Sequence, residues 1–171
     1  ALVATRMQDH PLPLKLCYID PIFRRSSDSR EMETFQAGVE FIGSAGPDAD
    51  AAAISACLET LSAMGLTEVL VDVGHVDFIS GLDASQKEAL LAGDYLAFGK
   101  IPTRGGIETV SDYPELVALS KALGQDDRVS FNFGLVKDLA YYTGLIFEVI
   151  DPATKQVVAS GGRYDTLLSK F

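Results

Sequence analysis

The sequence predicts an α+β fold in which an antiparallel sheet is flanked by helices. Segments with alternating or β-branched residues occur in neighbouring pairs joined by turns, which is typical of hairpins. Helical patterns are few and do not alternate regularly with strands, as they would in βαβ units. The chain of 171 residues, of which 47% are hydrophobic, is long enough to bury one sizeable core.

The first two strands are expected to form a hairpin. Residues 15–23 (KLCYIDPIF) alternate and contain β-formers, and residues 34–44 (TFQAGVEFIGS) resume that pattern. The segment between them, RRSSDSREME, is polar and has no apolar period. We therefore expect an antiparallel pair joined by an arginine-bearing loop.

A helix and a strand are expected next. Pro47 suits the first turn of a helix, and Gly65 is placed to end it. Between them, apolar residues repeat with a period of 3.6, at Ala51, Ile54, Cys57, Leu58, Leu61 and Met64. Residues 68–73 then place valine at every second position, which predicts a strand.

The remaining chain is expected to hold helices first and strands afterwards. Asp83 can cap a helix that extends to about residue 97, and Pro114 can begin another that Gly124 ends. The stretch between these helices is irregular and rich in glycine. Three strands then follow, at residues 129–133, 145–150 and 156–159, and the turn DPATK joins the last two.

Composition disfavours several classes of function. The chain has 14 basic and 24 acidic residues and a net charge of -10, and its basic residues are scattered, so tRNA or another nucleic acid is a disfavoured partner. Two cysteines and two histidines lack the spacing of a zinc site, so we expect no metal and two reduced, largely buried thiols, as in a cytoplasmic protein. No apolar run reaches about 18 residues, so no membrane-spanning helix is expected.

Four short segments contain polar residues that strand packing alone does not require. Taken singly, each is more often structural, because a hairpin arginine is usually solvated and a Gly-Gly pair is often only a turn. Their order along the chain distinguishes them. The segments are residues 23–25 (FRR), 36–40 (QAGVE), 137–144 (KDLAYYTG) and 160–165 (SGGRYD).

In that order the segments resemble the histidyl-tRNA synthetase family, which includes class II synthetases and their non-catalytic paralogues, the regulatory subunits of ATP phosphoribosyltransferase. Residues 16–44 resemble class II motif 2. FGLVKDLAYYTGLIFEV resembles the first histidine signature, which normally reads LVRGLDYYTG, and ASGGRYDTLL resembles the second. The resemblance implies a class II synthetase-like sheet over the whole chain, 1–171, with a shortened helical insertion around residues 82–128. It also implies that this chain is part of a longer protein.

The resemblance assigns a histidine-binding site to the chain. Glu40 and Tyr142 match the family positions that hold the imidazole ring, which needs an acceptor and a hydroxyl. Gln36 matches the position that faces the amino group. Because strand side chains alternate, Gln36, Gly38 and Glu40 should share one face, with Gly38 leaving room for a ligand. Tyr141 should then point away into packing.

The second signature and the neighbouring segments complete the expected site. Gly161, Gly162 and Tyr164 are expected to line the pocket. Lys137 stands where the synthetase signature has an arginine that would clamp the ligand carboxylate, and lysine lacks the bidentate fork of arginine. His75 is expected to be a structural turn residue.

Positions that handle the nucleotide depart from the synthetase pattern. In motif 2 the family enzyme carries Arg-x-Glu, and here Ser26 replaces the glutamate that contacts ATP. Arg24 remains as the candidate ligand of a phosphate. Losses at nucleotide positions beside retained histidine positions predict a protein that senses histidine without activating it.

We therefore expect a regulatory subunit with no catalytic residue and no cofactor. The resemblance implies that it binds L-histidine as the feedback effector of histidine biosynthesis. It also implies a homo-oligomer within a hetero-oligomer that contains the short-form ATP phosphoribosyltransferase catalytic subunit. Two alternatives remain open: a synthetase core that binds histidine and ATP and aminoacylates tRNA, and a paralogue with another ligand or a structural role.

Overall fold

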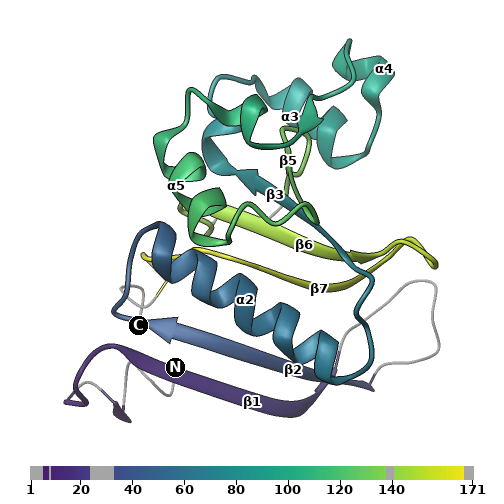
Figure 1. The fold of residues 1–171 in the computed structure, drawn as a ribbon. Coiled ribbons are helices and arrows are strands. Elements are labelled where there is room, and N and C mark those ends of the chain that lie inside the picture. The colour runs from purple at the N-terminus through teal and green to yellow at the C-terminus, as the bar shows by residue number, and fades with distance from the viewer. Residues whose placement is uncertain (1–5, 8, 24–32, 138–140, 168–171) are drawn as a thin grey trace.

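The computed structural model describes residues 6–7, 9–23, 33–137 and 141–167, and it has an α+β architecture (Figure 1). Along the chain the elements are β1 (Leu14–Phe23), β2 (Glu33–Ile42), α2 (Pro47–Ala63), β3 (Leu70–His75), η1 (Val76–Ile79), α3 (Ala84–Leu91), α4 (Tyr95–Phe98), β4 (Arg104–Gly105), η2 (Ile107–Val110), α5 (Pro114–Ala122), β5 (Val129–Asn132), β6 (Leu145–Asp151) and β7 (Gln156–Gly162). None of the helices in this described part has the length and apolar character needed to cross a bilayer.

The predicted first hairpin is confirmed. Strands β1 and β2 pair antiparallel from Leu14 opposite Ile42 to Phe23 opposite Glu33. Its connecting loop, residues 24–32, lies outside the described residues, and so does the predicted phosphate ligand Arg24. Cys17 is exposed on the hairpin, which corrects the expectation of a largely buried thiol there, because the outer face of this hairpin is not covered within the described chain.

The larger sheet is mixed rather than purely antiparallel. Its strand order is β4-β5-β3-β6-β7, and β3 pairs with β5 in parallel, whereas the other pairs are antiparallel. A parallel pair needs a crossover connection, and residues 76–128 provide one. This non-local connection is the reason that neighbouring-hairpin reasoning did not predict the parallel pair.

Several element boundaries differ from the sequence prediction, and strand β7 extends to Gly162 instead of ending at residue 159. Strand β3 begins at Leu70 rather than residue 68 and continues to His75. The helix expected from Asp83 to about residue 97 is two helices, because Gly93 adopts a left-handed φ of 67° and Asp94 caps a new turn. Asp83 does cap the first of them with a capping box. The other two predicted helices, α2 and α5, begin at their prolines as expected.

Helices α2 and α5 pack against one face of the five-stranded sheet. The core between them contains Ile54, Leu58 and Leu61 from α2, Leu116 and Leu119 from α5, and Val71, Val73, Phe131, Leu145, Phe147 and Val149 from the sheet. Figure 1 shows α2 crossing in front of β7 and β2, so the helix spans the junction between the sheet and the hairpin. The opposite face of the sheet holds the side chains of Asp72 and Glu148 together with the buried Ile146.

Candidate functional site

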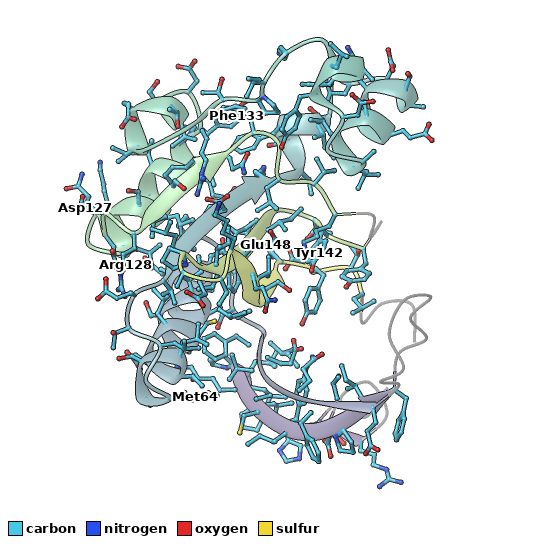
Figure 2. All side chains as sticks on the ribbon, turned by 90° about the vertical axis from the view of Figure 1, so that its right-hand side faces the viewer. Met64, Asp127, Arg128, Phe133, Tyr142 and Glu148 are labelled. Atoms are coloured by element: carbon cyan, nitrogen blue, oxygen red, sulfur yellow. The ribbon has the colours of Figure 1, made fainter. Side chains whose placement is uncertain are left out.

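The candidate site lies where the polar face of the large sheet meets the inner face of the hairpin. Tyr142 precedes β6, and Glu148 lies within it. Figure 2 shows these two side chains beside each other, with Tyr142 directed toward the space between the sheet and the hairpin. The other contributors come from β2 and from the segment that follows β7.

The hairpin supplies three predicted positions on one face. Gln36, Gly38 and Glu40 are all half-buried, whereas the intervening residues Ala37 and Val39 are exposed. The alternation predicted from the sequence is therefore confirmed, and it places the Gln36 and Glu40 side chains on the side of the strand that faces the rest of the chain.

The space above Gly38 is occupied by a side chain. A Cβ atom on Gly38 would lie 2.5 Å from the ring of Tyr18 on the paired strand. The Tyr18 hydroxyl accepts a hydrogen bond of 2.5 Å from Nε2 of Gln36. The expected room for a ligand is thus filled by Tyr18 in this structure, because Tyr18 is the cross-strand partner of Gly38.

Three tyrosines form an aromatic cluster next to Glu40. The ring centroids of Tyr142 and Tyr164 are 6.4 Å apart, and the Tyr164 hydroxyl donates a hydrogen bond to a carboxylate oxygen of Glu40. Tyr141 packs at 4.8 Å from Tyr142 and edge-on to Tyr164. The expectation that Tyr141 points away was therefore wrong, because this segment is not a strand and its side chains need not alternate.

Burial keeps the two inner phenols protonated. Desolvation, the neighbouring Tyr141 and, to a smaller extent, the charges of Glu148 and Glu40 together raise the pKa of Tyr142 to about 12. Desolvation and the hydrogen bond to Glu40 raise the pKa of Tyr164 above its ordinary value. Both hydroxyls are thus available as neutral donors and acceptors at physiological pH.

The two glycines of the second signature face opposite sides of β7. A Cβ atom on Gly162 would lie 2.6 Å from the Tyr142 ring, so this glycine allows the ring to lie against the backbone. A Cβ atom on Gly161 would instead meet the Phe147 ring on the core face. The prediction that Gly161 lines the site is therefore wrong, because adjacent strand residues point to opposite faces.

Arg163 anchors the segment that carries Tyr164. Its guanidinium pairs with Asp50 of α2 and Glu115 of α5, and its side chain is only 16% exposed. Its backbone N–H donates to the Leu145 carbonyl at 2.8 Å, and its carbonyl accepts from the Thr143 N–H at 2.9 Å. These bonds hold the segments around Tyr142 and Tyr164 together.

Lys137 forms an ion pair with Glu148 in β6. The Lys137 and Glu148 side chains are 28% and 17% exposed, so the pair is partly desolvated. Sequence reasoning assigned no role to Glu148. Its signal was available, since it is the one charged residue inside the apolar run LIFEVI, on the face opposite to Phe147.

A second polar network continues along the same sheet face. The buried carboxylate of Asp72, opposite Glu148 in the strand register, accepts hydrogen bonds from Arg104 at 2.5 Å, Ser130 at 2.7 Å and Asn132 at 3.0 Å. These bonds join β3 to β5 and β4. The fully bonded Asp72 is a structural residue that sequence reasoning also missed.

His75 is structural, as predicted. It is 8% exposed, and its Nδ1 accepts a hydrogen bond from the Asp77 N–H at the start of η1. Among the described residues, no group of three or more candidate metal ligands occurs.

One open hollow on the surface lies apart from the tyrosine cluster. It has a volume of about 450 Å³ and is lined by Leu58, Glu59, Ser62, Ala63 and Arg128. The charged group of Arg128 is already bonded to Asp126. This hollow brings together none of the predicted site residues, so the convergence of polar groups defines the candidate site instead.

The fold brings Glu40, Tyr142 and Tyr164 together, places Gly162 against Tyr142, and places Gln36 on the same strand face as Glu40. It places Lys137 on Glu148 and turns Gly161 toward the core. The cluster is built from three segments, at residues 40, 141–142 and 164, and the hydrogen bond from Tyr164 to Glu40 joins residues 124 positions apart in the chain.

A helix-backed, mainly antiparallel sheet with a polar, tyrosine-rich cluster on its open face defines a class II aminoacyl-tRNA synthetase-like protein. The sequence model described as "Histidyl-tRNA synthetase" matches residues 2–94 and 99–171. The chain belongs to the histidyl-tRNA synthetase family.

Two curated relatives of this chain carry the same description. The chain is 34% identical to an ATP phosphoribosyltransferase regulatory subunit of Symbiobacterium thermophilum and 31% identical to that of Syntrophotalea carbinolica, with 99% of this chain covered in both alignments. The alignments cover 54% and 50% of those proteins. The chain therefore spans about half the length of the curated relatives it matches.

Solved structures show the same fold. An ATP phosphoribosyltransferase regulatory subunit/histidyl-tRNA synthetase from Bacillus halodurans superposes with a TM-score of 0.87 at 28% identity, covering 99% of this chain and 56% of that one. A chain from the ATP phosphoribosyl transferase complex of Thermotoga maritima superposes with a TM-score of 0.68 at 20% identity, covering 95% and 72%. The second likeness concerns the fold alone.

Proposed function

We propose that this chain is part of a regulatory subunit of ATP phosphoribosyltransferase that binds L-histidine as a feedback effector and does not itself catalyse a reaction. The regulatory part of the proposal is supported by the names of its relatives. The histidine part is supported by the site: the chain retains the residues that match the family's histidine positions, and the fold gathers them at one place.

The observation that carries the histidine proposal is the contact between Tyr164 and Glu40 beside Tyr142. A carboxylate accepts hydrogen bonds through about four lone-pair directions, so Glu40 can bond to Tyr164 and to an imidazole N–H at once. Tyr142 stays protonated and can donate to the other ring nitrogen. Aromatic rings on the remaining sides suit a flat ligand.

Two features favour a protein that binds histidine but does not activate it with ATP. Lys137, which replaces the signature arginine, is paired with Glu148 and lacks the planar fork that would stabilise a reacting carboxylate and phosphate together. Ser26 offers no carboxylate at the motif 2 position where the synthetases hold ATP. The polar groups that are retained are those suited to an amino acid.

The proposed partner is the short-form catalytic subunit of ATP phosphoribosyltransferase, with which this protein would form a hetero-oligomer that contains more than one copy of it. The fold-level relative from Thermotoga maritima comes from an ATP phosphoribosyl transferase complex, which supports this choice. Regulation of such a partner is a coupling free energy, typically about 1–3 kcal/mol, between the histidine site and the active site of the partner. Histidine shifts the partner only through its different affinity for two states of the assembly.

We also infer that the helical insertion around residues 82–128 is shortened. The alignment with the Symbiobacterium thermophilum protein extends over 215 positions, whereas this chain has 171 residues. At least 215 − 171 = 44 aligned positions therefore lie opposite gaps in this chain. The elements that the structure gives in this region are all short: α3, α4, β4, η2 and α5.

Isothermal titration calorimetry with L-histidine tests the proposed function. We expect saturable binding by the unsubstituted protein and a loss of roughly ten- to 100-fold in affinity for Glu40→Gln, since the hydrogen bond to the imidazole loses its charge. Glutamine preserves the volume of the side chain and an acceptor for Tyr164, whereas Glu40→Ala would leave that hydroxyl unpaired. Glu33→Gln, on the exposed end of the same strand, is the matched control and should bind histidine normally.

Membership of the histidyl-tRNA synthetase family favours one alternative, a synthetase core. A synthetase core would catalyse histidine-dependent pyrophosphate exchange, and we expect this protein not to catalyse it. Lys137→Arg should not restore it, because Ser26 still lacks the carboxylate expected to contact ATP. Exchange by the unsubstituted protein, or by Lys137→Arg alone, would favour the synthetase over the regulatory subunit.

A further inference from the structure

We propose that Glu148 is a positioning residue that holds the Lys137 ammonium against the tyrosine cluster, so that this lysine selects ligands that carry an α-carboxylate. The proposal rests on the histidine site proposed above and adds a residue to it. Its starting observation is the ion pair between Lys137 and Glu148, in which Glu148 is the more buried partner.

The location of Glu148 puts this pair at the site rather than elsewhere on the sheet. Its charge contributes to the raised pKa of Tyr142, as does that of Glu40, so both carboxylates lie near the same phenol. In the strand register Glu148 lies between Asp72 on β3 and Ser160 on β7. It is therefore held in the middle of a rigid sheet, next to the ring that would contact the ligand.

The rigid position of Glu148 compensates for the flexibility of the lysine side chain. A lysine ammonium sits on a flexible four-carbon stem, whereas an arginine has a preorganised fork. Fixing such a side chain weakens binding by roughly three- to ten-fold when the ligand must do it. A carboxylate from the sheet that orders Lys137 in advance removes this cost from ligand binding.

The ammonium retains free hydrogen-bonding capacity in this arrangement. Lysine has three N–H donors, and within the described residues the structure gives one oxygen of Glu148 as its partner. The remaining donors can meet a ligand carboxylate. The neighbouring Asp72 cannot take the place of Glu148, because its own carboxylate is occupied by Arg104, Ser130 and Asn132.

The test compares L-histidine with L-histidinol, which has a hydroxymethyl group instead of the carboxylate, by calorimetry on the protein. We expect Lys137→Gln to weaken histidine binding by about ten-fold or more, as for the loss of a charged hydrogen bond. We expect Glu148→Gln to weaken it by roughly three- to ten-fold, the cost of ordering the lysine. Both variants should bind histidinol as the unsubstituted protein does.

The double variant separates positioning from simple structural damage. Because Glu148 acts through Lys137, the double variant should bind histidine no more weakly than Lys137→Gln alone. Equal losses for histidine and histidinol in Glu148→Gln, additive losses in the double variant, or unchanged or tighter histidine binding by Glu148→Gln would each overturn the role of Glu148. Failure of the unsubstituted protein to bind histidine would instead overturn the histidine site itself.

Discussion

The Tyr164 hydroxyl and the Glu40 carboxylate determine how the hairpin and the large sheet meet at the site. Removing one partner of a bond to a charged group costs about 1.5–3 kcal/mol, so we expect Tyr164→Phe to lower the free energy of unfolding by about that amount. Urea denaturation measures the change. Tyr95→Phe, an exposed tyrosine on α4, is the control and should change stability by less than about 0.5 kcal/mol.

The pKa of Tyr142 predicts a pH dependence at the alkaline end. Its folded pKa is raised from 10.0 to about 12, so between these values the folded state holds a proton that the unfolded state has lost. The associated stability is fully present below pH 10 and is lost as the pH rises through about 12. Urea denaturation at a series of pH values should show this loss, and Tyr142→Phe should make it shallower. The same slope in Tyr142→Phe would contradict the assignment.

At the residue scale, the sequence supported predictions that depend on local periodicity. The shared face of Gln36 and Glu40 followed from strand alternation alone. The occupation of Gly38 by Tyr18 did not, because it depends on the register between two strands. Glu148 was missed for a similar reason: its partner Lys137 is identified only when β6 and the preceding segment are placed in space.

At the scale of elements, Arg163 ties the strand β7 to the helices α2 and α5. Its partner Asp50 is 8% exposed, and leaving one charge of a buried pair without its partner is strongly destabilising, by about 3–5 kcal/mol. We expect Arg163→Met to lower the free energy of unfolding by about 3 kcal/mol. Glu115→Gln should cost less than about 1 kcal/mol, since Glu115 is more exposed and Asp50 remains to pair with Arg163.

Urea denaturation of both variants checks that Arg163→Met loses more unfolding free energy than Glu115→Gln. A small effect of Arg163→Met, comparable with that of Glu115→Gln, would mean that Arg163 does not anchor the segment.

Prediction of helices and strands succeeded where the sequence signals are local and failed where the pairing depends on the topology of the sheet. The prolines at the starts of α2 and α5 and the Asp83 capping box marked helix starts correctly. The break at Gly93 was missed because a glycine within a helical pattern is often tolerated. The parallel pairing of β3 with β5 was missed because residues 76–128 separate the two strands.

At the scale of the whole molecule, the tyrosine cluster and the helix α5 are physically connected. Glu115 belongs to α5, and it contacts Arg163 next to Tyr164. A ligand that changes the position of Tyr164 therefore has a direct route to α5 and to the surface around it. A coupling between sites requires such an element with two arrangements that the ligand favours differently.

A histidine titration of phosphoribosyltransferase activity, in the complex of this protein with a short-form catalytic subunit, decides whether histidine regulates the partner through this site. We predict that histidine inhibits the complex containing the unsubstituted protein or Glu33→Gln, and that Glu40→Gln removes the sensitivity. Inhibition at the same histidine concentration in the Glu40→Gln complex, or no inhibition in the unsubstituted one, would contradict the proposal that histidine regulates the partner through Glu40.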